Sequence, residues 1–178
     1  ILTHQIFVFM LGARHEDKNA IEQQVHTPQK RIEQYVPSEI KILSQMTIEQ
    51  KVGQLFIFGF YGNTLNPDLK ALIQGNKAGG LLILGRNITD TSQLKKLIRQ
   101  SQSSSTIPLF ISIDQEGGTV ARLGGNSILT TSQSRMDTSK EAYDIAYERG
   151  KILKSYGINI NYAPVVEYVT SPSAFMYQ

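Results

Sequence analysis

Residues 111–123 read ISIDQEGGTVARL, an apolar segment that runs directly into two carboxylates, a pair of glycines and an arginine. Residues 109–113 present apolar side chains on both faces, without the alternation expected of a half-exposed strand. This pattern is typical of a buried parallel strand. Because α/β proteins place their polar sites at the carboxyl ends of such strands, we expect a functional site to begin at Asp114.

The polar part of this stretch contains residues suited to ligand binding. Gly117 and Gly118 allow backbone conformations that other residues avoid, and they permit a close approach to a ligand. Arg122 provides a permanently charged, planar fork for hydroxyl or carboxylate oxygens. Retaining glycosidases use two carboxyl groups about 5 Å apart, but the spacing of Asp114 and Glu116 does not define that separation. A structural role, as a helix cap or as the partner of Arg122, is the alternative for each carboxylate.

Apolar segments alternate with helical patterns along the rest of the chain. The spacing predicts strands at residues 54–60, 80–84, 109–113 and 158–161. Capping signals predict helix starts at Thr47, Asn66, Asp90 and Thr138, and helix ends at Gly75 and Gly157. Repeated strand–helix units predict an α/β fold with a parallel sheet. Spacing does not distinguish a doubly wound sheet from part of a barrel, but no glycine-rich phosphate-binding motif follows any predicted strand.

Length and composition limit the possible folds and partners. The chain has 178 residues, fewer than the roughly 250 of a complete (β/α)8 barrel, so we expect an incomplete barrel if the fold is of that type. The net charge of +3 is small and the basic residues are scattered, which argues against nucleic-acid binding. The absence of cysteine excludes disulfides and thiolate metal sites and leaves the cellular compartment open.

Residues 1–37 differ in composition from residues 38–178, which we expect to form the (β/α) domain. The apolar run at residues 6–11 is too short to span a bilayer, so no transmembrane segment is predicted. With two small residues behind it, the run is typical of the end of a secretory signal, although a buried local strand or helix would look the same. Residues 14–37 are polar and indicate a linker or a marginal helix. These features favour the cell envelope or secretion over the cytoplasm.

The DQEGG of residues 114–118, followed by Val120 and Arg122, resembles the signature of glycoside hydrolase family three in its β-N-acetylhexosaminidase branch. Three further segments resemble that family in the same order: MTIEQKVGQLF at residues 46–56, GGLLILGRN at residues 79–87 and GININYAPVV at residues 157–166. The likeness begins near residue 43 and extends to the end of the chain. It implies a parallel (β/α) repeat that forms the amino-terminal part of a TIM-like (β/α)8 barrel, truncated in this chain.

The resemblance implies roles for individual residues. In the family, the residue matching Asp114 hydrogen-bonds sugar hydroxyls, and the residue matching Arg122 also lines the sugar pocket. Glu116, Arg86 and Glu167 are further candidates to line the site, although Glu167 stands where the family usually has an aspartate. The family implies a small carbohydrate substrate, with no metal and no organic cofactor.

The resemblance assigns no catalytic role to any residue of this chain. It implies an Asp–His acid/base pair on a mobile loop and an aspartate nucleophile on a later strand, both beyond Gln178. The three histidines of the chain precede the recognised region: His4, His15 and His26. We therefore expect an amino-terminal fragment of a retaining glycosidase that is inactive alone.

The intact parent would hydrolyse terminal β-linked N-acetylglucosamine, with peptidoglycan fragments or chitin oligomers as substrates. Three alternatives stay open. The parent could be a β-glucosidase of the same family, or a non-catalytic sugar-binding domain of the same fold. An open-sheet phosphate or nucleotide binder is the third, and the missing phosphate loop argues against it. The sequence predicts no oligomeric state.

Overall fold

The computed structural model describes residues 38–166 of the chain. Helix α2 (Ser38–Gln45) belongs to one compact unit, and the residues from Met46 onward belong to another. The apolar run at residues 6–11, the polar stretch that follows it and Glu167 lie outside the described residues. The division at residue 38 between an amino-terminal segment and the (β/α) domain stays a prediction.

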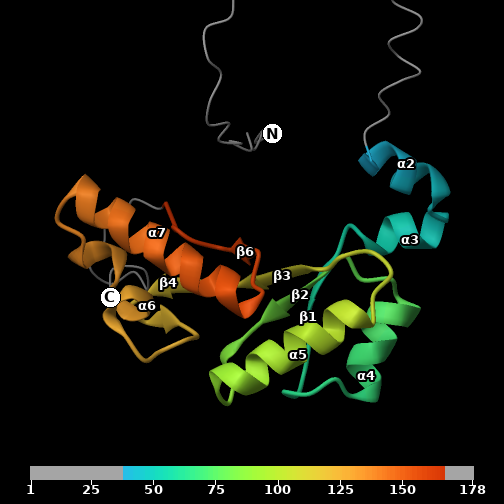
Figure 1. Ribbon diagram of the computed structural model, residues 1–178, viewed down its shortest axis with the longest axis horizontal. Coiled ribbons are helices and arrows are strands. Elements are labelled where there is room, and N and C mark those ends of the chain that lie inside the picture. Colours follow the sequence, from blue (N-terminus) through green and yellow to red (C-terminus); the bar gives the residue numbers. More distant parts are fainter. Residues whose placement is uncertain (1–37, 167–178) are drawn as a thin grey trace, which may run out of the picture. The chain divides into compact units, whose positions relative to one another are not determined.

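The second unit is built on a sheet of four parallel strands (Figure 1). In their order across the sheet, these strands are β1 (Ile57–Gly59), β2 (Gly80–Ile83), β3 (Phe110–Ile113) and β6 (Ile160–Asn161). This order is also their order along the chain. A doubly wound sheet reverses its strand order at a switch point, and no reversal occurs among these four strands. The arrangement is that of consecutive (β/α) units in a barrel.

All four predicted strands are present, and each is shorter than the apolar pattern predicts: β1 by four residues, β6 by two, and β2 and β3 by one each. The first is predicted from residue 54, yet the backbone N–H groups of Leu55 and Phe56 donate back to Val52 and Gly53 in a turn, at 3.1 Å each. At β6, the N–H of Ile158 donates to Leu153 at the end of the preceding helix. Helix-end hydrogen bonds therefore replace strand pairing at these positions.

Helices lead into and connect these strands. They are α3 (Ile48–Gly53), α4 (Pro67–Lys70) with a π-helical continuation (Ala71–Gly75), α5 (Thr91–Ser103), α6 (Ser127–Thr130) and α7 (Ser139–Tyr156). Two short 3-10 turns occur at Gly85–Asn87 and Gln133–Arg135. Figure 1 shows α5 and α7, the two long helices of this unit, between successive strands of the repeat.

The predicted helix starts are confirmed. In each case a capping oxygen accepts a hydrogen bond from the backbone N–H three residues later, at 2.8 to 3.3 Å; the capping residues are Thr47, Asn66, Asp90 and Thr138. Gly157 ends α7 in the left-handed conformation, with φ +91°. The segment after α4 ends at Gly75 as predicted, but Lys77 is the residue with positive φ, at +56°. The residue with left-handed backbone therefore lies two positions after Gly75, beyond the end of the π-helical turn.

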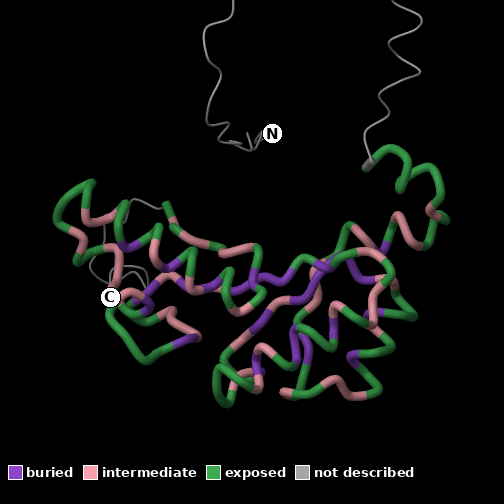
Figure 2. The backbone as a smooth tube through the Cα atoms, in the orientation of Figure 1, coloured by how far each residue is buried: buried purple, intermediate pink, exposed green. Residues whose placement is uncertain are grey.

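The sheet is apolar on both faces, as residues 109–113 predict, but only one face is fully covered. Leu81, Ile83, Ile111 and Ile113 are at most 1% exposed and form one core with residues of the helices (Figure 2). Alternation along each strand turns the intervening side chains to the opposite face. On that face Phe110 is 52% exposed. The second face therefore has apolar surface that the described residues leave open to solvent.

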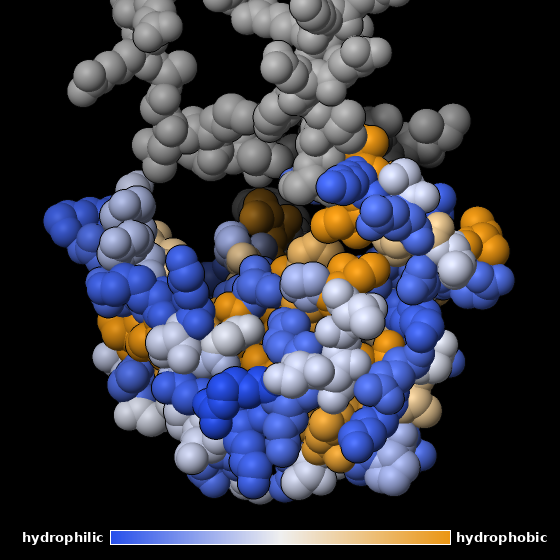
Figure 3. Space-filling view, turned by 45° about the vertical axis from the view of Figure 1, so that its right-hand side comes forward, coloured by the Kyte–Doolittle hydropathy of each residue, from blue (hydrophilic) through white to orange (hydrophobic). Residues whose placement is uncertain are grey.

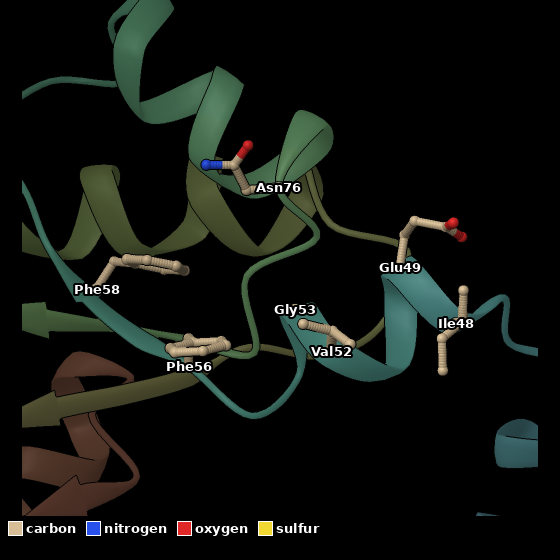
Figure 4. A pocket seen from close by; sticks show the side chains of 7 residues that line it. All are labelled: Ile48, Glu49, Val52, Gly53, Phe56, Phe58 and Asn76. Atoms are coloured by element: carbon tan, nitrogen blue, oxygen red, sulfur yellow. The ribbon is translucent and has the colours of Figure 1, made fainter.

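A second apolar surface lies beside β1. Phe56 and Phe58 stack with ring centroids 5.8 Å apart, and the ring of Phe56 points toward Gly53 of helix α3 (Figure 4). Together with Ile48 and Val52 they line a groove of about 400 Å³. Phe56 is half exposed. An incomplete barrel is expected to leave Phe56, Phe58 or Ile111 poorly covered. This occurs at Phe56, whereas Ile111 is fully buried because its side chain lies on the face of the sheet that packs against the helices.

We expect the chain to self-associate when it is produced alone. Within residues 38–166, β1 and β6 each pair on one side only, and apolar side chains adjoin the free edge of β1. Unpaired edges beside apolar surface promote association, and Figure 3 shows hydrophobic residues at the surface among hydrophilic ones. Light scattering over a range of concentrations should show assemblies that Phe56→Ser reduces. A monomer with a sharp, reversible two-state melt would contradict this expectation.

Candidate functional site

The carboxyl end of β3 leads into a short antiparallel hairpin made of β4 (Gln115–Gly117) and β5 (Val120–Ala121). Asp114 lies between Ile113, the last residue of β3, and this hairpin. The turn uses positive φ angles at Gly117, +93°, and Gly118, +61°. The predicted left-handed backbone is therefore confirmed at both glycines, whereas the close approach to a ligand stays a prediction. A Cβ atom on Gly117 would overlap the carbonyl oxygen of Thr131.

Asp114 and Arg122 form an ion pair across the mouth of the hairpin. Arg122 Nη2 donates to Asp114 Oδ2 at 3.2 Å, and the two side chains are 30% and 26% exposed. Both groups are thus partly desolvated while some of their surface still faces solvent. Arg122 Nε is buried without an acceptor among the described residues. A hydroxyl-bearing ligand at this point would meet a carboxylate acceptor and a guanidinium donor side by side.

Gln115 holds the hairpin together from inside, a role that was not predicted from the sequence. Its fully buried amide donates to the carbonyls of Leu123, at 3.0 Å, and Leu129, at 2.7 Å. Its Oε1 accepts from the N–H groups of Arg122, at 3.0 Å, and Leu123, at 2.8 Å. The backbone of Arg122 is therefore fixed by Gln115. Strand alternation offered a signal, because the residue between two outward carboxylates points inward.

Two asparagines of the last strand segment extend the sheet to the site. Asn161 accepts from the N–H of Gln115, at 2.9 Å, and donates to its carbonyl, at 3.1 Å. Asn159 makes the equivalent pair with Ile111 N–H, at 2.8 Å, and with Leu109 C=O, at 3.2 Å. Each side-chain amide thus substitutes for a backbone peptide in the ladder. The residue after Asp114 is anchored to β6 in this way.

Glu116 lines a polar pocket of about 950 Å³, whose lining does not include Asp114 or Arg122. The other lining residues come from the hairpin turn and from residues 127–135, many of them carrying hydroxyl groups. Neither structural alternative for Glu116 holds among the described residues, since Arg122 pairs with Asp114 and the helix caps are other side chains. The two carboxylates that lie two residues apart therefore serve different surfaces.

Arg86 and Asn87 follow β2 at the same edge of the sheet as Asp114. Arg86 Nε donates to the carbonyl of Phe60, at 3.0 Å, and its guanidinium lies 4.7 Å from the ring centre of Tyr61. Asn87 is fully buried and donates to the carbonyls of Phe60, at 3.1 Å, and Gly62, at 2.7 Å. Asn87 therefore shapes the loop after β1, the structural role weighed for it. Among the described residues, Arg86 forms no hydrogen bond or ion pair with Asp114 or Arg122.

Two further properties concern the described residues as a whole. Within residues 38–166, no group of three or more His, Cys, Asp or Glu side chains is placed to bind a metal ion. No helix in the same part of the chain combines the length and apolar character needed to cross a membrane.

Comparison with known proteins identifies relatives of this region. The family model for the glycosyl hydrolase family 3 N terminal domain matches residues 47–175. Beta-hexosaminidase A of Pseudoalteromonas piscicida is 38% identical over 124 residues, which are 62% of this chain and 20% of that protein. The structure of a glycoside hydrolase family 3 beta-N-acetylglucosaminidase from Paenibacillus sp. str. FPU-7 is 36% identical, with a TM-score of 0.63, over 67% of this chain and 24% of that one.

A beta-N-acetylhexosaminidase structure from Beutenbergia cavernae also has a TM-score of 0.63, at 28% identity, covering 72% of this chain and 40% of that one. This chain spans from 20% to 34% of the length of the two first curated relatives. The neighbours share a TIM-barrel-like (β/α) fold, which confirms the predicted fold class and excludes the doubly wound sheet that spacing left open. The chain belongs to glycosyl hydrolase family 3 and contains that family's N-terminal domain sequence over residues 47–175.

Proposed function

We propose that the protein containing this chain is a retaining glycosidase that removes terminal β-linked N-acetylglucosamine. The observation that carries the proposal is the Asp114–Arg122 pair at the carboxyl end of β3, in a domain whose relatives are named beta-hexosaminidases and beta-N-acetylglucosaminidases. Barrel enzymes place their active sites at this end of the strands. Peptidoglycan fragments or chitin oligomers are the proposed substrates.

In this proposal Asp114 and Arg122 bind the terminal sugar and do not react with it. The carboxylate accepts from sugar hydroxyls, and the guanidinium donates to a sugar oxygen, so that both hydrogen bonds are charge-assisted. Three further charged residues are proposed to line the sugar-binding site: Glu116, Arg86 and Glu167. Glu116 has a polar pocket of its own, and Arg86 lies at the end of the neighbouring strand.

The nucleophile and the acid/base group of the proposed reaction lie outside this chain. Residues 38–178 contain no histidine for proton transfer. We therefore expect the chain alone to release no product from a chromogenic N-acetyl-β-glucosaminide above background, whereas the full-length protein turns it over. Turnover by the chain alone that disappears in Asp114→Asn or Glu116→Gln would contradict this part of the proposal.

Asp114→Ala and Arg122→Ala in the full-length protein should each lower kcat/KM for the N-acetyl-β-glucosaminide at least tenfold. A charge-assisted hydrogen bond contributes about 1.5 to 3 kcal/mol, which corresponds to roughly ten- to a hundred-fold in affinity. Sugar contacts away from the reacting carbon also serve the transition state, so kcat falls together with binding. The melting temperature should change little, because a partly exposed ion pair contributes only about 0 to 1 kcal/mol to stability.

Two exposed residues of the same types serve as controls for the loss of charge. Among the described residues, Asp144 on α7 pairs only with Lys140, and Arg99 lies on the exposed side of α5. Asp144→Ala and Arg99→Ala should keep full activity. If Asp114→Ala and Arg122→Ala also kept it, the pair would be structural. If the full-length protein preferred a β-glucoside to the N-acetyl-β-glucosaminide, it would be a β-glucosidase. If it bound the sugar without hydrolysing the substrate, it would be a non-catalytic sugar-binding protein.

A further inference from the structure

Arg149 is a buried cation that the site described above does not use. It lies in the middle of α7 and is 6% exposed. Its guanidinium donates to four backbone carbonyls: Nε to Ile128 at 2.9 Å, Nη1 to Glu116 at 2.6 Å and to Gln115 at 3.4 Å, and Nη2 to Thr131 at 2.8 Å. A single side chain thus ties α7 to strand β4 and to the end of helix α6.

The charge of Arg149 has no carboxylate partner within the described residues, where the ion pairs join other side chains. Burial lowers the pKa of its guanidinium from the usual value, but arginine stays protonated in proteins. The carbonyl dipoles therefore compensate the charge. A buried cation held only by backbone oxygens makes the positions of those oxygens energetically important, because each lost hydrogen bond would leave the charge less compensated.

Two of the four carbonyls that Arg149 holds belong to the hairpin that follows Asp114. Gln115 and Glu116 are in β4, and Thr131 supplies the oxygen that packs where a Cβ of Gly117 would lie. The double glycine turn has wide conformational freedom, so its geometry needs support from outside the hairpin. Arg149 provides this support by donating to the carbonyl of Glu116, and Asn161 adds to it by accepting from the backbone N–H of Gln115.

We propose that Arg149 is a positioning residue, which holds the β4 backbone so that the Asp114 carboxylate meets Arg122 and the bound sugar in a fixed geometry. This inference rests on the proposed function, because the sugar is the ligand that the fixed geometry serves. Sites bind well when a second layer of hydrogen bonds immobilises the contacting groups. The guanidinium spreads its donors over three nitrogens in a rigid plane, whereas the donors of lysine all lie on one nitrogen.

The first test uses Arg149→Lys in the full-length protein, since lysine keeps the positive charge in the helix. Hydrogen exchange of the amides of residues 115–123 should become at least tenfold faster than in the wild type. Leu153→Ala, a buried core change one turn along the same helix, is the control for a general loss of stability and should leave these amides no faster than the rest of the domain. Unchanged exchange in Arg149→Lys would overturn the proposal, and this readout requires no sugar.

The second test measures kcat/KM for the chromogenic N-acetyl-β-glucosaminide in a double-mutant cycle. Arg149→Lys should lower kcat/KM at least tenfold, and Leu153→Ala less than twofold at a temperature where both variants are folded. In the Asp114→Ala background, Arg149→Lys should have less than a twofold further effect, because the group that it positions is gone. Fully multiplicative losses would overturn the proposal. A wild type without activity on this substrate would instead refute the proposed function, with the exchange result still deciding the role of Arg149.

Discussion

Gly117→Ala should lower the free energy of unfolding of the full-length protein by about 2 to 5 kcal/mol. Gly117 has φ +93°, and an alanine in left-handed backbone costs about 1 to 2 kcal/mol. The new methyl group also overlaps the Thr131 carbonyl oxygen, which Arg149 holds in place. Because backbone cannot rotate away as a side chain can, overpacking adds about 1 to 3 kcal/mol. Urea denaturation measures the total loss of free energy of unfolding, provided that the m-value does not change.

Gly125→Ala is the matched control for this substitution. Gly125 has φ +99°, nearly the same conformation, but no atom lies within 4 Å of the position that a Cβ would take. In this variant the free energy of unfolding should therefore fall only by the cost of placing alanine in left-handed backbone, about 1 to 2 kcal/mol. Sugar affinity should fall in Gly117→Ala and not in Gly125→Ala. Equal losses of stability in the two variants would mean that the hairpin relaxes freely, against the rigid packing described here.

Gln115→Leu should destabilise the full-length protein by about 4 kcal/mol or more. The substitution keeps the approximate volume of a fully buried side chain but removes its four hydrogen bonds. Two backbone N–H groups and two carbonyls then lose their partner, and each unsatisfied buried group costs about 1 to 3 kcal/mol. The backbone of Arg122 is released at the same time. We therefore also expect kcat/KM for the N-acetyl-β-glucosaminide to fall at least tenfold.

Gln102→Leu tests whether that loss of activity comes from the site. The amide of Gln102 makes a similar pair of bonds, to the N–H and the carbonyl of Leu109, at 2.9 Å each. It acts just before the first residue of β3, at the end of the strand opposite to Asp114. This variant should lose stability, about half as much as Gln115→Leu, and keep its kcat/KM. A comparable fall in activity would show that general destabilisation, and not the hairpin geometry, lowers turnover.

Local features of the fold could be predicted because they depend on residues close together in the chain. A capping oxygen such as that of Asp90 reaches the N–H three residues later, so the helix start is encoded within four positions. The apolar run before Asp114 predicts a buried strand and places the carboxylate at its end for the same reason. Even here, the boundaries of β1 and β6 shifted, because a helix end takes the backbone N–H groups of Leu55, Phe56 and Ile158.

The connections within the candidate site arise from contacts between distant segments, for which the sequence carries no local signal. Spacing left open which carboxylate pairs with Arg122, and the hairpin brings Asp114 to it while Glu116 turns toward another pocket. Arg149 reaches the carbonyl of Glu116 from 33 residues away. Its acceptors are backbone oxygens, which every residue possesses, so no residue type at the other end marks the contact. Only the folded backbone places those oxygens around one guanidinium.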